Sequence, residues 1–363
     1  MRIAVLHDEV GDGAALDVQD VLAQVRVVEA ALLGLGHEAV VLSCGMDLAK
    51  VRDALVRARP DLVFNLVEST GGYGAMIQVI PSLLEALSIP YTGASMEALG
   101  VTSNKVVAKR RLRSAGLRTA PWISASDAVT AVEAVTTSTA RAMTWNDRVD
   151  LAVEASDVAV DGRWILKPVW EHASVGLDAS AVVEGRGLEH VRGMLRERAL
   201  RLGHRLFAER FIEGREINIA LLDGPNGVSV LPPAEICFLD FSEDRPRIVD
   251  YRAKWVEYSF EYIHTPRSFT FSADDESSWL AEARWMAQKA WTEFGLSGYA
   301  RVDFRVDDRQ QPWILEINTN PCLSPDAGFA AALARAGIDF SRAVGRIVGC
   351  AIASHRFVSP ATL

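Results

Sequence analysis

The chain has 363 residues, 49% of them hydrophobic and 23% charged, which is enough for two or three globular domains. Its 47 acidic and 38 basic residues give a formal charge of −9, and this balance argues against a nucleic acid as the main partner. The four cysteines form no C-x-x-C pair, which favours a reducing compartment without structural zinc. The sequence lacks a run of about 18 apolar residues and its N-terminal apolar run is short, so we expect a cytoplasmic protein that does not enter a membrane.

The first hundred residues alternate between short apolar runs and helical patterns. Strand-like runs occur at 2–6, 39–42 and 61–65, and helical patterns occur between them at 18–35 and 47–59. This order predicts a parallel sheet with helices on its faces. The motif G-x-G-x-x-G does not follow the first strand, so this region is not a standard dinucleotide-binding unit.

From Trp164 a new unit begins, in which the pattern indicates strands gathered with helices to one side, an α+β C-terminal half. A basic helix is expected at 103–115, and residues 135–150, rich in Thr, Ser and Ala, have the composition of the least ordered region. Further strands are expected at 164–168, 206–210, 216–222, 229–231, 301–306 and 313–318, and further helices at 279–294 and 327–354.

Two neighbouring runs near the C-terminus, 301–306 and 313–318, carry the strongest chemical signal. Each alternates with period two, so its polar residues share one face of a strand. The residues expected on the polar faces are Arg301, Asp303 and Arg305 from the first run and Ile314, Glu316 and Asn318 from the second. Leu315 is expected on the opposite face.

A hairpin centred on Arg309-Gln310 places Asp303 opposite Glu316 and Arg301 opposite Asn318. Directly opposed residues have Cβ atoms roughly 5 Å apart, so the two carboxylates repel each other unless a proton or a cation lies between them. Oxygen ligands without His or Cys favour Mg²⁺ over zinc. The same alternation also fits an exposed polar face of an antiparallel sheet.

Several lysines and acids are further candidates for binding a nucleotide. Lys167 ends an apolar strand and precedes the small-residue loop 173–176, whose backbone N–H groups can approach phosphates. Lys105 and Lys254 are two more candidates, because an ammonium between phosphates offsets their charge. Glu209 and Glu216 lie seven residues apart, a spacing that suits an adenine amino group and a ribose hydroxyl. A solvent-exposed side chain is the alternative for Lys167 and for Glu209.

Taken in chain order, these segments resemble the ATP-grasp superfamily, and specifically the D-alanine–D-alanine ligase family, over nearly the whole chain. The matching segments are Ile89-Pro-Tyr-Thr-Gly93, Ser103-Asn-Lys105, Ala120-Pro-Trp122, Ile165-Leu-Lys-Pro168, Ser174-Val-Gly176, 207–216, Ala253-Lys254, Arg301-x-Asp303 and Glu316-x-Asn318-Thr-x-Pro321. The resemblance implies an N-terminal parallel α/β substrate domain at 1–100, followed by a two-lobed ATP-grasp fold. Its central lobe is expected at 101–190 and its C-terminal lobe, with the Mg-ATP site, at 191–363. A homodimer is also implied.

The implied activity is ligation of a small-molecule carboxylate to an amine. The carboxylate attacks the γ-phosphate of ATP to give an acyl phosphate and ADP, and the amine then displaces phosphate. By matched position, the resemblance implies that the phosphates of ATP are bound by Lys105, Lys167, Ser174 and Lys254, the adenine by Glu209 and Ile212, and the ribose by Glu216. It also implies two Mg²⁺ ions, for which Mn²⁺ can substitute, bound by Asp303, Glu316 and Asn318. Arg301 is expected to stabilise the tetrahedral intermediate.

The residues expected to bind the substrates depart from the family pattern. The family's N-terminal Gly-Gly-x-Ser segment is not visible, and the differing positions are Val67-Glu68, His172-Ala173, Trp255, Cys322 and Ala327. We therefore expect substrates other than two D-alanines. Glu68, and after it Glu9, are candidates for binding a substrate ammonium, although both fit solvated loop acids equally well.

Two aromatic residues and a cysteine accompany these departures. Cys322 stands where the family uses a backbone N–H, so its thiol has no implied chemical role, and a nucleophile there is the weaker alternative. Trp170 and Trp255 would either cover a bulky substrate or pack in the core.

Three functions remain open from the sequence. The first is an amino-acid or dipeptide ligase, and the second is a ligase that attaches an amino acid to a larger natural-product or peptide acceptor. The third is an inactive nucleotide-binding protein, against which the intact set of Arg301, Asp303, Glu316 and Asn318 argues.

Overall fold

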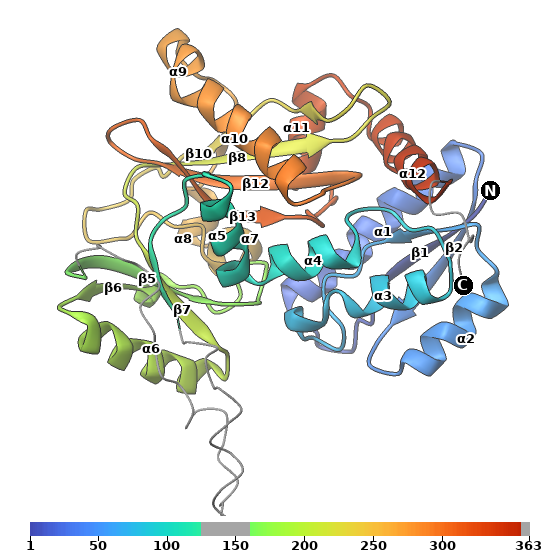
Figure 1. Ribbon diagram of the computed structural model, residues 1–363, viewed down its shortest axis with the longest axis horizontal. Coiled ribbons are helices and arrows are strands. Elements are labelled where there is room, and N and C mark those ends of the chain that lie inside the picture. The colour runs from blue at the N-terminus through green and yellow to red at the C-terminus, as the bar shows by residue number, and fades with distance from the viewer. Residues whose placement is uncertain (125–159, 357–363) are drawn as a thin grey trace, which may run out of the picture.

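Three β-sheets organise the part of the chain that the computed structural model describes, residues 1–124 and 160–356 (Figure 1). The segment 135–150, expected to be the least ordered, lies outside the described residues. Among the described helices, none combines the length and the apolar character needed to cross a membrane.

The first sheet is parallel, as predicted, with the strand order β2-β1-β3. Helix α1 packs on one face through Val25 and Val28, and α2 and α3 pack on the other through Leu55 and Leu84. Burial on both faces explains why β1 and β3 read as continuous apolar runs, whereas the edge strand β2 is more exposed. The elements are β1 (Arg2–Asp8), α1 (Leu16–Gly34), β2 (Glu38–Cys44), α2 (Leu48–Ala58), β3 (Leu62–Asn65), η1 (Gly74–Met76) and α3 (Val79–Ala86).

The second sheet is antiparallel, with the order β4-β7-β5-β6, and α6 covers one of its faces. The boundary expected near residue 190 falls inside α6, and β7 beyond it pairs with β5 in the same sheet. Sheet membership therefore changes after residue 210. The elements are β4 (Trp122–Ser124), β5 (Gly162–Pro168), η3 (Ala179–Ala181), β6 (Val182–Gly185), α6 (Leu188–Leu202) and β7 (Leu206–Arg210).

The third sheet is also antiparallel, with the order β11-β10-β8-β12-β13 and with β9 paired to β8. Its apolar face packs against α10, α4 and α5 in one core. Helices α4 and α5 thus pack on the third sheet, although most of their residues were expected in the central lobe. The elements are α4 (Met96–Ser103), α5 (Lys105–Ser114), β8 (Arg215–Leu222), β9 (Ser229–Val230), β10 (Ala234–Ile236), β11 (Arg267–Ser268), α10 (Trp279–Glu293), β12 (Tyr299–Val306) and β13 (Pro312–Asn318).

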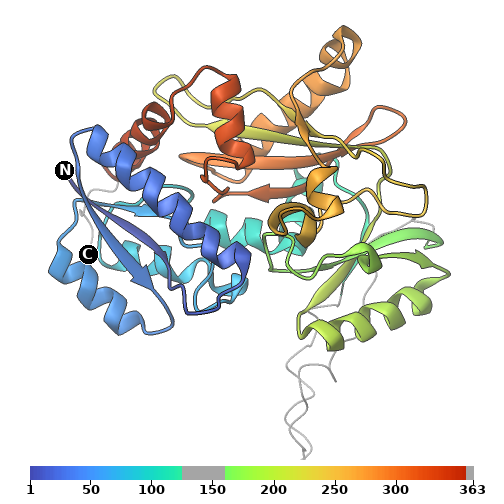
Figure 2. The same ribbon diagram turned by 180° about the vertical axis from the view of Figure 1, so that it is seen from behind.

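The remaining helices join these layers. Helices α11 (Gly328–Arg335) and α12 (Phe340–Arg356) share a core with α1 and with residues of β8 and β12, so the N-terminal sheet is packed against the third sheet (Figure 2). Three short helices, α7 (Tyr251–Trp255), α8 (Phe260–Ile263) and α9 (Ala273–Ser277), lie between β10 and α10 in the chain.

Candidate active site

The polar face of the third sheet brings together the residues of the acidic hairpin. Asp303 lies opposite Glu316, and Arg301 lies opposite Asn318, which confirms the predicted register. On the other side of β12, Asn218 of β8 is the partner of Asp303. Because side chains alternate along each strand, these polar groups share one face while their neighbours enter the core.

One detail of the hairpin differs from the strict alternation. The register shifts between Asp303 and Phe304, so Phe304 pairs with Ile314 and Leu315 is an extra residue on β13. This β-bulge reverses the expected faces: Ile314 is buried in the core, and Leu315 lines the cavity beside Glu316. The prediction that Ile314 shares a face with Glu316 is therefore wrong.

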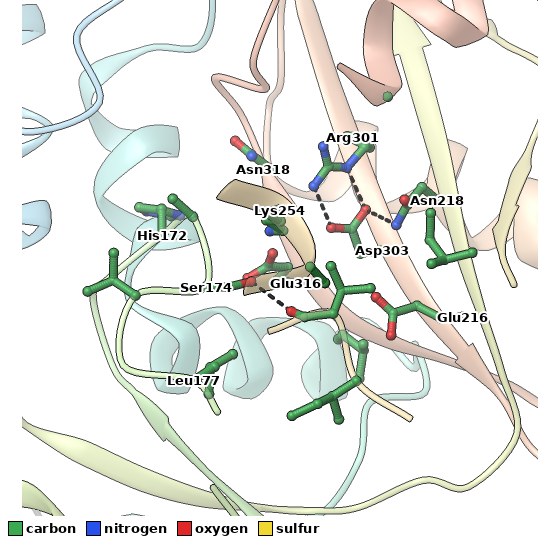
Figure 3. Close-up of a pocket in the computed structure, with 18 of the residues that line it drawn as sticks. His172, Ser174, Leu177, Glu216, Asn218, Lys254, Arg301, Asp303, Glu316 and Asn318 are labelled. Carbon is green, nitrogen blue, oxygen red and sulfur yellow. Dashed lines mark hydrogen bonds and ion pairs between the residues drawn. The ribbon is translucent and has the colours of Figure 1, made fainter. Parts of the chain in front are cut away.

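A cavity of about 440 Å³ lies between the second and third sheets and reaches the N-terminal domain. Figure 3 shows several of its side chains, drawn from the loop after β5, from α7 and from the third sheet. Of the residues predicted from the sequence, the cavity is lined by Lys105, Lys167, Ser174, Glu209, Ile212, Glu216, Lys254, Arg301, Asp303, Glu316, Asn318, Glu68 and Cys322.

Two residues singled out by the sequence lie outside this cavity lining. Glu9 is exposed, and its carboxylate lies beside Gly45. Trp170 packs against a small core that contains Val106 and Phe207. Glu9 is thus badly placed to bind a ligand in the cavity, and the structure supports core packing for Trp170.

Arg301 and Asp303 form a bidentate pair on β12. The guanidinium donates to both carboxylate oxygens at 2.7 and 2.8 Å, and the Asn218 amide donates to Oδ1 at 2.8 Å (Figure 3). Burial alone would lower the pKa of Arg301, but the Asp303 carboxylate outweighs burial and raises it. The arginine therefore presents a fixed positive charge at the cavity wall.

Glu316 lies among positive side chains. The Nζ atom of Lys105 is 4.0 Å from its carboxylate. Burial alone would raise the pKa of Glu316, but Lys105 and then Lys254 outweigh it and lower the pKa to about 2. The carboxylate is consequently ionised at neutral pH.

The oxygen donors of Asp303, Glu316 and Asn318 occupy adjacent positions on two paired strands. Such a donor set suits a hard cation such as Mg²⁺. The third donor, Asn318, is an amide, and in the part of the chain that the structure describes no group of three His, Cys, Asp or Glu side chains is placed to hold a metal ion.

The loop after β5 has an unusual backbone. Ala173 and Ser174 adopt positive φ angles of 57° and 60°, a conformation uncommon outside glycine. Two contacts hold it: the Ser174 hydroxyl donates to the Val249 carbonyl at 2.8 Å, and the Trp255 indole donates to the Ala173 carbonyl at 2.9 Å. Trp255 follows Lys254 on α7, so this bond fixes that lysine against the loop.

Glu209 and Glu216 have different surroundings. Glu209 is buried on β7 and forms ion pairs with Lys167 and Lys109, which lower its pKa although burial alone would raise it. Glu216 accepts a hydrogen bond from Arg305 at 3.2 Å, but burial outweighs this contact and raises its pKa.

The N-terminal end of the cavity is acidic. Gln24 donates to Glu68 at 3.2 Å and to Asp20 at 3.3 Å, and Asp20 also accepts from the Cys322 thiol at 3.0 Å and the Ser324 hydroxyl at 2.7 Å. Burial raises the pKa of Glu68 to about 8. Within the described residues, neither Glu68 nor Asp20 forms an ion pair with a lysine or arginine.

Sequence reasoning missed several residues of the site. Asn218 stands two positions after the predicted Glu216, so period-two alternation was a signal for it. Arg305 was expected on the polar face of the hairpin but was given no role in the site. His172 stood out only as a departure from the family pattern; burial lowers its pKa to about 4, and its Nε2 has no hydrogen-bond partner in the described part of the chain. Asp20 and Lys109 lie on helices, where a single charged residue carries no such signal.

Comparison with known proteins shows which family the chain resembles. The family model "D-ala D-ala ligase C-terminus" matches residues 135–349. A D-alanine–D-alanine ligase of Gloeobacter violaceus is 32% identical over 96% of this chain and 98% of the relative. An uncharacterised protein, y4sG of Sinorhizobium fredii, is 28% identical over 89% of this chain and 86% of its own length.

Solved structures show the same fold over nearly the whole chain. The D-alanine–D-alanine ligase of Bacillus anthracis in complex with ATP has a TM-score of 0.67 at 19% identity, covering 99% of this chain and all of that one. The enzyme of Coxiella burnetii has a TM-score of 0.65 at 19% identity, with 98% and 96% covered. The parallel N-terminal sheet followed by two antiparallel sheets is therefore a shared architecture.

Proposed function

Because this chain belongs to the D-alanine–D-alanine ligase family, and is thus an ATP-grasp ligase, we propose that it forms an amide bond between amino acids other than two D-alanines. The observation that carries this proposal is the cavity itself. Arg301, Asp303, Glu316 and Asn318 line one wall, together with three lysines, while the N-terminal end carries acids.

For the nucleotide, we propose that ATP lies between the second and third sheets, and the Bacillus anthracis ligase of the same fold, solved in complex with ATP, supports a nucleotide site here. Lys105, Lys167 and Lys254 would hold its phosphates together with the Ser174 loop. The ribose would meet Glu216, and the adenine would lie near Ile212 and Glu209 at the end of β7. The ammonium groups of these lysines would bind the phosphates strongly, because the attraction between opposite charges is larger where much of the solvent is excluded.

We assign Mg²⁺ to Asp303, Glu316 and Asn318, whose oxygen donors fit it, with Mn²⁺ as a substitute. When bound, the ion would neutralise the phosphate oxygens of ATP. Glu316 is ready for this role because Lys105 and Lys254 keep it ionised. Two ions are the number expected for this family.

The chain's own residues would act in two steps. The lysines hold the γ-phosphate in line with the attacking substrate carboxylate, which gives the acyl phosphate and ADP. Arg301, fixed by its two bonds to Asp303, then stabilises the negative charge that develops when the amine attacks the acyl carbon and phosphate leaves.

The substrate end supports an amino acid of a different kind from D-alanine. Glu68, Cys322 and Ala327 line the cavity at positions where the sequence departs from the family pattern. Glu68 is the residue we assign to a substrate ammonium, because it is partly buried near Asp20 without a positive partner among the described residues. We further propose a cytoplasmic homodimer, which sedimentation of the purified protein and cell fractionation would test.

The function is tested by measuring ADP release with ATP, Mg²⁺ and pooled amino acids of both configurations. We expect release with at least one pair other than two D-alanines, together with a new amide in the mass spectrum. Release that occurs only with a non-amino-acid acceptor would favour the ligase with a larger acceptor. If every carboxylate and amine pair leaves ATP intact, the proposal is wrong.

A further inference from the structure

A buried group of three charges crosses from α5 to the second sheet. Lys109 on α5, Glu209 on β7 and Lys167 on β5 form two ion pairs, one on each oxygen of the glutamate. The side chains of Lys109 and Glu209 are each 1% exposed, whereas that of Lys167 is 12% exposed and reaches the cavity. Of the two lysines, therefore, only Lys167 can meet a ligand directly.

The hydrogen-bond partners of the Lys109 ammonium are all groups of the protein, and none of them is a ligand in the cavity. Its ammonium also donates to the Thr119 hydroxyl at 2.7 Å and to the Ala120 carbonyl at 2.9 Å. The Thr119 hydroxyl in turn donates to the carbonyl of Ile314 at 2.7 Å, on the strand that carries Glu316. Lys109 thus links the second sheet to the acidic hairpin without lining the cavity.

The charges of this group do not cancel. Two lysines and one glutamate leave one net positive charge. We place this charge at Lys167, because the Lys167 side chain is 12% exposed and that of Lys109 only 1%. Without Lys109, the Glu209 carboxylate would neutralise Lys167 completely, since the two form a direct pair. A neutral pair attracts phosphate far less than a free ammonium does.

We propose that Lys109 is a positioning residue for ATP, which neutralises Glu209 so that the charge of Lys167 remains available to the phosphates. This inference rests on the proposed function, in which Lys167 contacts ATP. It also changes the expected role of Glu209. Because both of its oxygens are engaged by lysines, we assign the carboxylate to holding Lys167 in place and not to the adenine amino group.

If Lys109 acts by neutralising Glu209, removing the charge of Glu209 as well should restore ATP binding to a Lys109 variant. A purely structural role for Lys109 does not predict such a rescue. Lys109→Met leaves a neutral Lys167–Glu209 pair. The double variant K109M/E209Q removes both inner charges and restores one net positive charge at Lys167. Lys109→Arg keeps the charge and the donors. The matched control is Lys50→Met, because Lys50 is exposed on α2.

The measurement is calorimetric binding of ATP and of adenosine to the full chain, with thermal unfolding as the check on folding. We expect K109M to bind ATP about 10- to 100-fold more weakly, the range for losing a charged contact, and adenosine within about twofold of wild type. K109M/E209Q is expected to return to within about fivefold of the wild-type affinity for ATP, and K50M to match wild type.

Three outcomes overturn the inference while leaving the proposed function intact. They are wild-type ATP affinity in K109M, an equal loss for adenosine, and a double variant that binds ATP no better than K109M. If K109M does not fold, a K109M/E209Q protein that folds but still binds ATP more than about tenfold more weakly than wild type and K109R overturns it as well. Failure of the wild-type protein to bind ATP would instead contradict the proposed function.

Discussion

The two ends of the cavity differ in how their charged side chains are paired. At the end between the second and third sheets, acids and bases are interleaved, as in the pairs Arg301–Asp303 and Lys167–Glu209. At the N-terminal end, Glu68 and Asp20 lie together, held by Gln24 and hydroxyl or thiol donors. At the first end the acids are paired with lysines or an arginine of the chain and a positive charge remains at Lys167, whereas the acids of the second end have no positive partner among the described residues. The two ends of the cavity therefore differ in the charge that they offer to a bound molecule.

The largest effect is expected for Glu316→Ala at the interleaved end. Removing this carboxylate takes away an oxygen donor that Lys105 and Lys254 keep ionised. We expect ADP release to fall about a thousandfold or more, because the phosphate charge is then poorly neutralised. Asp308→Ala, in the exposed turn of the same hairpin, is the control. Unchanged turnover in the Glu316 variant would show that the assigned site is wrong.

The next effect concerns Glu68 at the acidic end. Burial raises its pKa to about 8, and Asp8, Asp20 and Asp17 add to this. We expect Glu68→Gln to raise the KM of the amine-bearing substrate roughly 10- to 100-fold at about pH 8.5, where the wild-type carboxylate is ionised. The wild-type KM should fall as the pH rises through about 8, and that of the variant should not. Glu9→Gln, an acid outside the cavity, is the control.

The raised pKa of the Glu68 carboxyl also predicts that the stability of the folded protein changes with pH. Its pKa in the folded chain exceeds the ordinary 4.5, so its favourable contribution is complete below pH 4.5 and is lost as the pH rises through 8. Glu68→Gln should therefore melt at the same temperature as wild type near pH 4 and at a higher temperature near pH 9. Equal differences at both pH values would contradict the assigned burial.

A smaller effect is expected where the two ends meet. The Tyr251 hydroxyl on α7 donates to Asp17 on α1 at 2.8 Å, so it ties the helix that carries Lys254 to the N-terminal domain. Tyr251→Phe removes one hydrogen bond of about 1 kcal/mol and should lower kcat/KM about fivefold. Tyr258→Phe is the matched control, since Tyr258 is 86% exposed. A loss as large in the control would rule out a specific role for the bond.

The smallest effect is expected for Cys322→Ser. Burial raises the pKa of this thiol, with Asp20 and Glu68 adding to the shift, so the nucleophilic thiolate does not form at neutral pH. Serine keeps a donor for Asp20, and kcat/KM should stay within about twofold of wild type. Inactivation by iodoacetamide that the substrate prevents would point to a chemical role for Cys322 instead.

The order of the elements and the pairing of the hairpin were predictable because both depend on local alternation. Period-two patterns in 301–306 and 313–318 were sufficient to place Asp303 opposite Glu316. The bulge at Leu315 was not predictable, because no glycine or turn residue marks it. The pairing of β5 with β7 was not predictable either, because it is a long-range contact between strands that α6 separates in the chain.

Periodicity and motif order are properties of neighbouring residues, and they were enough to predict the parallel N-terminal layer, the antiparallel hairpin and the set of lysines and acids. Which of these charges meet depends on packing between distant segments. Lys109 pairs with Glu209 from another element, and the Cys322 thiol reaches Asp20 from the far end of the chain. The net charge at each end of the cavity depends on these distant contacts, so the acidic character of the N-terminal end became visible only in the folded chain.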